Sequence, residues 1–79
     1  MLLSELSVGE SGIVTAMNLT KALRTRLVDM GIVCGVRVTL VRKAPFSDPL
    51  EIRVRNFNMG IRVKEAEKIE IKPVGRVKL

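Results

Sequence analysis

Few side chains in this 79-residue chain could take part in catalysis or metal binding. The sequence has no histidine and a single cysteine, Cys34. The usual zinc sites, catalytic triads and internal disulfides therefore lack their main side chains. We find no paired carboxylates, no nucleophile beside a base and no glycine-rich phosphate loop. We expect a binding protein with no catalytic residues and no bound cofactor, rather than an enzyme.

The sulfur atoms are the remaining candidates for a metal site. Cys34, Met30 and Met59 carry soft donors that suit transition metals. Their spacing matches no recognised ligand pattern, and methionine commonly fills hydrophobic cores. The sequence therefore predicts no specific metal site.

Basic residues are the most abundant functional groups. There are 14 Lys and Arg against 8 Asp and Glu, which gives a formal net charge of +6 and a pI near 10.3. This excess favours an anionic partner, such as a nucleic acid, an acidic protein surface or the inner membrane surface. Along most of the chain the basic residues alternate with Val, Ile and Leu, so they are expected on structured elements.

Two arginines lie close together in a segment with helical spacing. Arg24 and Arg26 could contact a partner, because a guanidinium makes bidentate bonds to carboxylate or phosphate and a helix can present both beside Lys21. The alternative is a solvated helix face on which Arg26 pairs with Asp29. Both interpretations remain open from the sequence.

The segment 44–49 is typical of a loop between two strands. Asp48 could contact a partner, but we favour a turn-forming role because aspartate bonds nearby backbone donors. Phe46 lies at the expected tip of the loop. It could contact a partner or cover the end of the fold, and the sequence favours neither.

Alternating apolar and polar residues predict five short strands. They are expected at residues 12–17, 36–40, 50–55, 57–63 and 69–71. A hairpin turn is expected near Asn56 and Phe57, because asparagine tolerates a positive φ. The last strand is expected to end before Pro73, which lacks a backbone donor.

One amphipathic helix is predicted between the first two strands, where the period changes from two to about 3.6. The apolar residues at this spacing are Leu19, Leu23, Leu27 and Met30. Asn18 or Thr20 can cap its N-terminus, and Gly31 can supply the left-handed residue that ends it.

These elements predict a mainly β fold. A flat sheet of five such strands would leave its apolar face in water, and closure into a small barrel avoids this. We predict an SH3-like β-barrel of about five strands, with the amphipathic helix inserted to cap one open end. The domain is expected at residues 1–72, followed by a basic C-terminal tail at 73–79. The predicted core is Ile13, Val38, Leu40, Ile52, Val54, Ile61, Ile69 and Ile71.

Four segments in order carry a family resemblance. They read LxxLxxGExGxV at 3–14, LRxRLxxMGIxxG at 23–35, APFSDP at 44–49 and IRVKEA at 61–66. Together they resemble the FeoA family, the small cytoplasmic accessory proteins of bacterial ferrous-iron uptake. The resemblance covers most of the chain from residue 3 to residue 71.

The resemblance implies an SH3-like adaptor that regulates FeoB, the membrane transporter of ferrous iron with a cytoplasmic GTPase domain. The chain would not itself transport iron. It would act in the cytoplasm or peripherally at the inner membrane. The candidate partner-binding residues are Lys21, Arg24, Arg26, Phe46, Asp48 and Arg62, the last of which lies in the fourth segment.

The net charge also leaves an RNA-binding small β-barrel as an alternative function. The chain has no Trp or Tyr and only Phe46 and Phe57 as aromatic residues, so it offers little for stacking bases or for binding polyproline. The longest stretch without charged residues, 11–20, is too short to span a bilayer. With acidic Glu5 and Glu10 at its start, the chain is expected to stay in the cytoplasm.

Overall fold

A computed structural model describes residues 1–76 and confirms a mainly β fold with five strands. The strands are β1 (Glu10–Met17), β2 (Arg37–Lys43), β3 (Leu50–Val54), β4 (Phe57–Ile61) and β5 (Ile69–Arg76). The helices are α1 (Lys21–Asp29) and α2 (Val63–Ala66), with 3-10 turns η1 (Leu3–Glu5) and η2 (Pro45–Ser47). Neither α-helix is long and apolar enough to cross a membrane.

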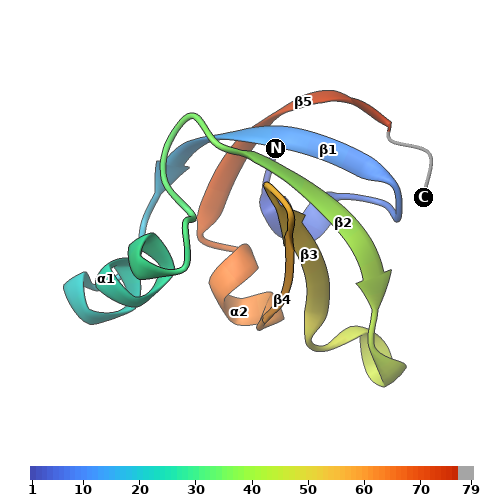
Figure 1. Ribbon diagram of the computed structural model, residues 1–79. Coiled ribbons are helices and arrows are strands. Elements are labelled where there is room, and N and C mark those ends of the chain that lie inside the picture. The colour runs from blue at the N-terminus through green and yellow to red at the C-terminus, as the bar shows by residue number, and fades with distance from the viewer. Residues whose placement is uncertain (77–79) are drawn as a thin grey trace.

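The strands form one curled antiparallel sheet in the order β4-β3-β2-β1-β5 (Figure 1). The sheet is not closed, because β4 and β5 are its edges and do not pair with each other. The short helix α2 connects these two edges, and η1 packs against both α2 and β5. The predicted closure is thus partial, with short helical segments where a full barrel would have a ladder of hydrogen bonds.

The core contains the residues predicted for it in β2 to β5, and it also contains Leu3, Leu6, Leu27, Ile32, Leu50 and Ala66, which were not predicted. Seven of the eight residues predicted for it are buried, and the exception is Ile13. In β1 it is Gly12 and Val14 that point inward, so the predicted register of this strand was wrong by one residue. Gly12 lies close to β5: a Cβ at this position would be 2.4 Å from Cδ1 and 3.1 Å from Cβ of Ile71, so the Ile71 side chain would have to move.

The β3–β4 hairpin turns one residue earlier than predicted. Val54 pairs with Phe57, which leaves Arg55 and Asn56 as the turn. Arg55, and not Asn56, has the positive φ, at 58°. Phe57, which was expected in the turn, is the first residue of β4 and is exposed.

The last strand is longer than the predicted 69–71. It runs through Pro73, which lies opposite Gly12 next to a register shift, as far as Arg76. Proline is tolerated because β5 is an edge strand with a neighbour on one side only. Residues 73–76 of the predicted tail therefore continue β5, and residues 77–79 lie outside the described part of the chain.

The predicted helix is present with its predicted end signals. The side chain of Thr20 accepts a hydrogen bond from Leu23 N at 3.3 Å, and Gly31 follows the helix with φ of 94°. In α1 only Leu27 is buried, and Met30 just after it is exposed. Figure 1 shows α1 to one side of the curled sheet, next to α2. The helix thus leaves much of its surface available.

Candidate functional site

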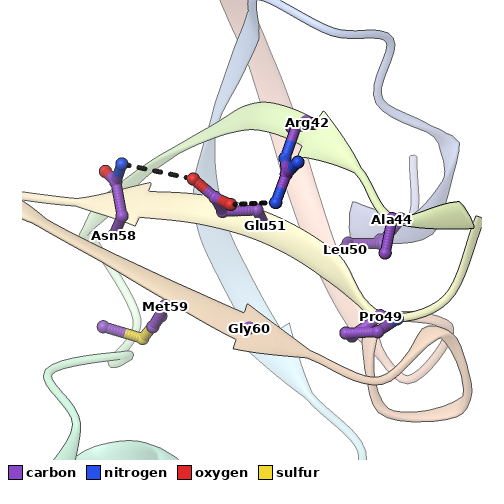
Figure 2. Close-up of a pocket in the computed structure, with 8 residues that line it drawn as sticks. All are labelled: Arg42, Ala44, Pro49, Leu50, Glu51, Asn58, Met59 and Gly60. Carbon is purple, nitrogen blue, oxygen red and sulfur yellow. Dashed lines mark hydrogen bonds and ion pairs between the residues drawn. The ribbon is translucent and has the colours of Figure 1, made fainter.

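Two shallow hollows lie beside each other along the β3–β4 hairpin. The first, called the hairpin hollow, has a volume of about 320 Å³ and is lined by Arg42, Ala44, Pro49, Leu50, Glu51, Asn58, Met59 and Gly60 (Figure 2). The second, called the helix hollow, has a volume of about 290 Å³ and is lined by Arg26, Met30, Pro49, Gly60, Arg62 and Glu65. Because both contain Pro49 and Gly60, they form one continuous surface, called here the candidate face.

The wall of the hairpin hollow is a chain of polar side chains held by strand register. Arg42 lies opposite Glu51, and Nη2 of Arg42 donates to Oε1 of Glu51 at 3.2 Å. Nδ2 of Asn58 donates to Oε2 of the same carboxylate at 3.4 Å. Figure 2 shows Glu51 between Arg42 and Asn58. Pro49 and Leu50 lie where β3 begins. The carboxylate is therefore neutralised within the hollow.

The helix hollow is organised by Glu65 in α2. Its Oε2 accepts from Nη2 of Arg26 in α1, and its Oε1 accepts from the backbone N–H of Arg62 at 3.2 Å. The first contact joins the two helices, and the second caps the N-terminus of α2. Met30 and Pro49 add apolar surface to this hollow.

Asp48 also supports α2. Its Oδ1 accepts from the backbone N–H of Val63 at 3.2 Å and lies 3.8 Å from Nη1 of Arg62. The structural role that we favoured from the sequence is present, but with a different partner. Instead of bonding a donor in its own turn, Asp48 satisfies a free donor at the start of a helix 15 residues away.

The structure brings three of the six sequence-predicted residues together and leaves three apart. Arg26, Asp48 and Arg62 meet around α2. Arg24 instead donates from Nη2 to the carbonyl oxygen of Met17 at 2.6 Å, which ties α1 to the end of β1. Two further predicted residues are exposed and line neither hollow: Lys21 in the first turn of α1 and Phe46 at the tip of η2.

The alternative pairing of Arg26 with Asp29 was wrong, because Arg26 pairs with Glu65. Glu65 is also the main residue that the sequence reasoning missed. Its position three residues after the N-cap Arg62 is the spacing of a capping box and could have indicated it. Gly60 lies inside a strand, where glycine often marks the close approach of another molecule, which is a second usable signal.

The three sulfur side chains do not meet in one site. Met30 lines the helix hollow and Met59 the hairpin hollow, whereas Cys34 donates from Sγ to the carbonyl oxygen of Thr15 at 3.6 Å. Within residues 1–76, no three His, Cys, Asp or Glu side chains lie together in a way that could hold a metal ion. The candidate face therefore offers ion pairs, amides and apolar surface for contact with another molecule.

Comparisons with known proteins give a consistent family. The family model described as the FeoA domain matches residues 1–73. The chain is 35% identical over 71 residues to the Fe(2+) transport protein A/Fe(2+) transporter FeoB fusion protein of Porphyromonas gingivalis. This match covers 90% of the chain but only 8% of the fusion protein.

Solved structures agree in fold. FeoA of Chlorobium tepidum has 36% identity and a TM-score of 0.90, and the match covers 95% of this chain and 71% of that one. FeoA of Stenotrophomonas maltophilia, described as a prokaryotic SH3 domain protein, has 32% identity and a TM-score of 0.77. That match covers 91% of this chain and 89% of the other. The predicted SH3-like fold is confirmed.

Proposed function

The chain belongs to the FeoA family, and on that basis we propose that it is a non-catalytic regulator that binds the cytoplasmic part of a FeoB-type ferrous-iron transporter. The family is associated with ferrous-iron transport. The observation that carries the proposal is the fusion protein of Porphyromonas gingivalis, in which a relative of this chain and a FeoB transporter form one polypeptide. A covalent link keeps two modules at high effective concentration. A separate chain would need a binding surface to maintain the same association.

The candidate face suits such a partner. Protein interfaces commonly have an apolar centre and a polar rim, and methionine adapts to irregular surfaces. Pro49, Met30 and Met59 supply the apolar part of the face, and the ion pairs of Arg26 and Arg42 surround it. We therefore assign transporter binding to this face.

Regulation would follow from selective binding. A bound protein shifts a conformational equilibrium only if it prefers one state of its partner. We propose that the chain binds one nucleotide-dependent state of the transporter's GTPase region, without contributing a catalytic residue. Because that region is cytoplasmic in the FeoB-type transporters, the chain would act in the cytoplasm.

Calorimetric titration of the full chain with the cytoplasmic GTPase-containing region of a FeoB-type transporter from the same organism tests this proposal. Met30→Asp should weaken binding at least about tenfold, because it places a charge in the apolar centre of the face. Val74→Asp is the matched control, since Met30 and Val74 are similarly exposed, at 37% and 39%. Val74 lies on β5 and outside both hollows.

The proposal requires that Val74→Asp bind like the unmodified chain and that both variants keep the native circular dichroism spectrum. Absence of binding by the unmodified chain in both nucleotide states would refute transporter binding through this region. Equal weakening by the two variants would refute the assignment to the candidate face.

A further inference from the structure

The arginines of the described residues fall into two groups according to what they face. Five have a carboxylate or a backbone carbonyl oxygen as a partner inside the chain. Arg26, Arg42 and Arg62 each lie within 4.0 Å of a carboxylate, and Arg24 and Arg76 donate to the carbonyl oxygens of Met17 and Val8. Within residues 1–76, Arg37, Arg53 and Arg55 have neither kind of partner.

These three arginines line one hollow. Together with Val36 and Thr39 they surround a volume of about 150 Å³, called here the arginine hollow. Strand register places Thr39 opposite Arg53, and Arg37 lies two residues before Thr39 in β2, whereas Arg55 is the first residue of the turn that follows β3. Residues two apart in a strand share a face. The described lining of this hollow contains no carboxylate, so its positive charge is not neutralised from within.

Part of the arginine hollow is held in place. Nε of Arg53 donates to Oδ1 of Asn58 at 2.9 Å, which orients the guanidinium and leaves its two Nη groups for another acceptor. The hydroxyl of Thr39 is 2.7 Å from that of Ser11 in a buried pair. The floor of the hollow is thus fixed by the sheet.

The backbone of Arg55 has an unfavourable conformation. Its φ of 58° lies in the left-handed region, where glycine is favoured and a residue with a Cβ is strained. The two-residue hairpin turn requires this conformation, and an arginine adopts it less readily than a glycine would. Its guanidinium has no partner within residues 1–76 that would offset this cost. An anionic ligand in the arginine hollow would provide the partner that the Arg55 guanidinium lacks.

We propose that the arginine hollow binds a phosphate dianion, either free or as the terminal group of a phosphate monoester. Such a group carries a charge of about −1.5 to −2 at pH 7 and has three terminal oxygens. These oxygens can accept from three guanidiniums, whereas a carboxylate offers two oxygens and one charge. This inference rests on the arginine hollow and is independent of the proposed transporter binding.

Amide-shift titration of the labelled full chain with inorganic phosphate tests the proposal. Ionic strength is held constant with sodium chloride, and acetate serves as the comparison anion. Saturable shifts are expected at residues 36–39 and 53–55, with a Kd on the order of 1 mM and weaker binding of acetate. Equal shifts with acetate, or no saturable shifts with phosphate, would overturn the proposed phosphate site.

Two variants separate binding from folding. Arg55→Gly removes one guanidinium and relieves the strained φ, so phosphate affinity should fall roughly tenfold while thermal stability does not decrease. Arg76→Gln is the matched control, because this arginine is also on the sheet but lies on β5, lines none of the three hollows and donates to the carbonyl oxygen of Val8. In this control variant the phosphate affinity should change by less than about twofold. If both variants weakened binding equally, general charge attraction would explain the result and the site would be refuted.

Three further ligands identify the source of the phosphate group. Tighter binding of a nucleoside monophosphate than of inorganic phosphate would support a soluble nucleotide. Binding to vesicles that contain phosphatidic acid, but not to pure phosphatidylcholine vesicles, would support a lipid headgroup. An RNA oligonucleotide without terminal phosphates presents only phosphodiesters. If it bound the hollow more tightly than phosphate at equal phosphate concentration, the monoester proposal would fail in favour of RNA binding.

Discussion

The candidate face and the arginine hollow both contain several arginines, but they differ in what those arginines meet. On the candidate face, Arg26, Arg42 and Arg62 are matched by Glu65, Glu51 and Asp48. In the arginine hollow, Arg37, Arg53 and Arg55 have no carboxylate among the described lining residues. The net charge of +6 is therefore unevenly distributed. Apolar contacts should dominate recognition at the first surface and charge at the second.

The two surfaces should also differ in their contribution to stability. Arginines that face a carboxylate are part of the fold, and their loss or the loss of their partner should cost free energy. Arginines that line one hollow without a carboxylate repel one another, so loss of Arg37, whose side chain makes no ion pair within residues 1–76, should not lower the free energy of unfolding. Three substitutions test this contrast, in order of decreasing effect.

Glu65→Ala should have the largest effect. Its side chain is 12% exposed, and it holds both Arg26 and the backbone N–H of Arg62. Loss of a helix cap and a partly buried ion pair should lower the free energy of unfolding by about 1–2 kcal/mol, as measured by urea denaturation. Glu67→Ala, an exposed carboxylate at the end of the same helix, should change it by less than about 0.5 kcal/mol. Equal effects would contradict the role given to Glu65.

Arg42→Gln should have a smaller effect. The Arg42–Glu51 pair is more exposed, with side chains 69% and 33% accessible, so solvent screens it. The free energy of unfolding should fall by about 0.2–1 kcal/mol at low salt, and the difference should shrink in 0.5 M sodium chloride. A loss that does not depend on salt would indicate packing rather than charge.

Arg37→Gln should have the smallest effect and the opposite sign. Arg37 lies in the same strand as Arg42, but it faces two other arginines and no described carboxylate. Its removal should leave the free energy of unfolding unchanged or raise it by up to about 0.5 kcal/mol at low salt. A clear loss of stability would show that Arg37 has an internal partner and would remove the contrast between the two surfaces.

The strands were predictable where one face is buried and the alternation is strict. Residues such as Val38, Leu40 and Ile52 are buried as predicted. In β1, two apolar residues are adjacent, Ile13 and Val14, so the alternation does not say which of them points inward. That choice depends on register shifts against β5, which are set by pairing between distant segments.

The candidate site was predictable in its residues more than in their arrangement. Arg26, Asp48 and Arg62 could be selected as charged groups in segments with a family resemblance. The partner of Arg26 could not be predicted, because Glu65 is 39 residues away and no local spacing connects the two residues. The arginine hollow shows the same limit. Arg37 and Arg53 look like ordinary polar positions of strands until the register brings them beside Arg55.

Amide-shift mapping with the cytoplasmic GTPase-containing region of the transporter, with and without a GTP analogue, tests the proposed function most directly. The account predicts shifts at the residues that line the two hollows of the candidate face, above all Met30, Met59 and Gly60, and a difference between the nucleotide states. Shifts confined to β1 and β5, or no shifts in either state, would contradict it.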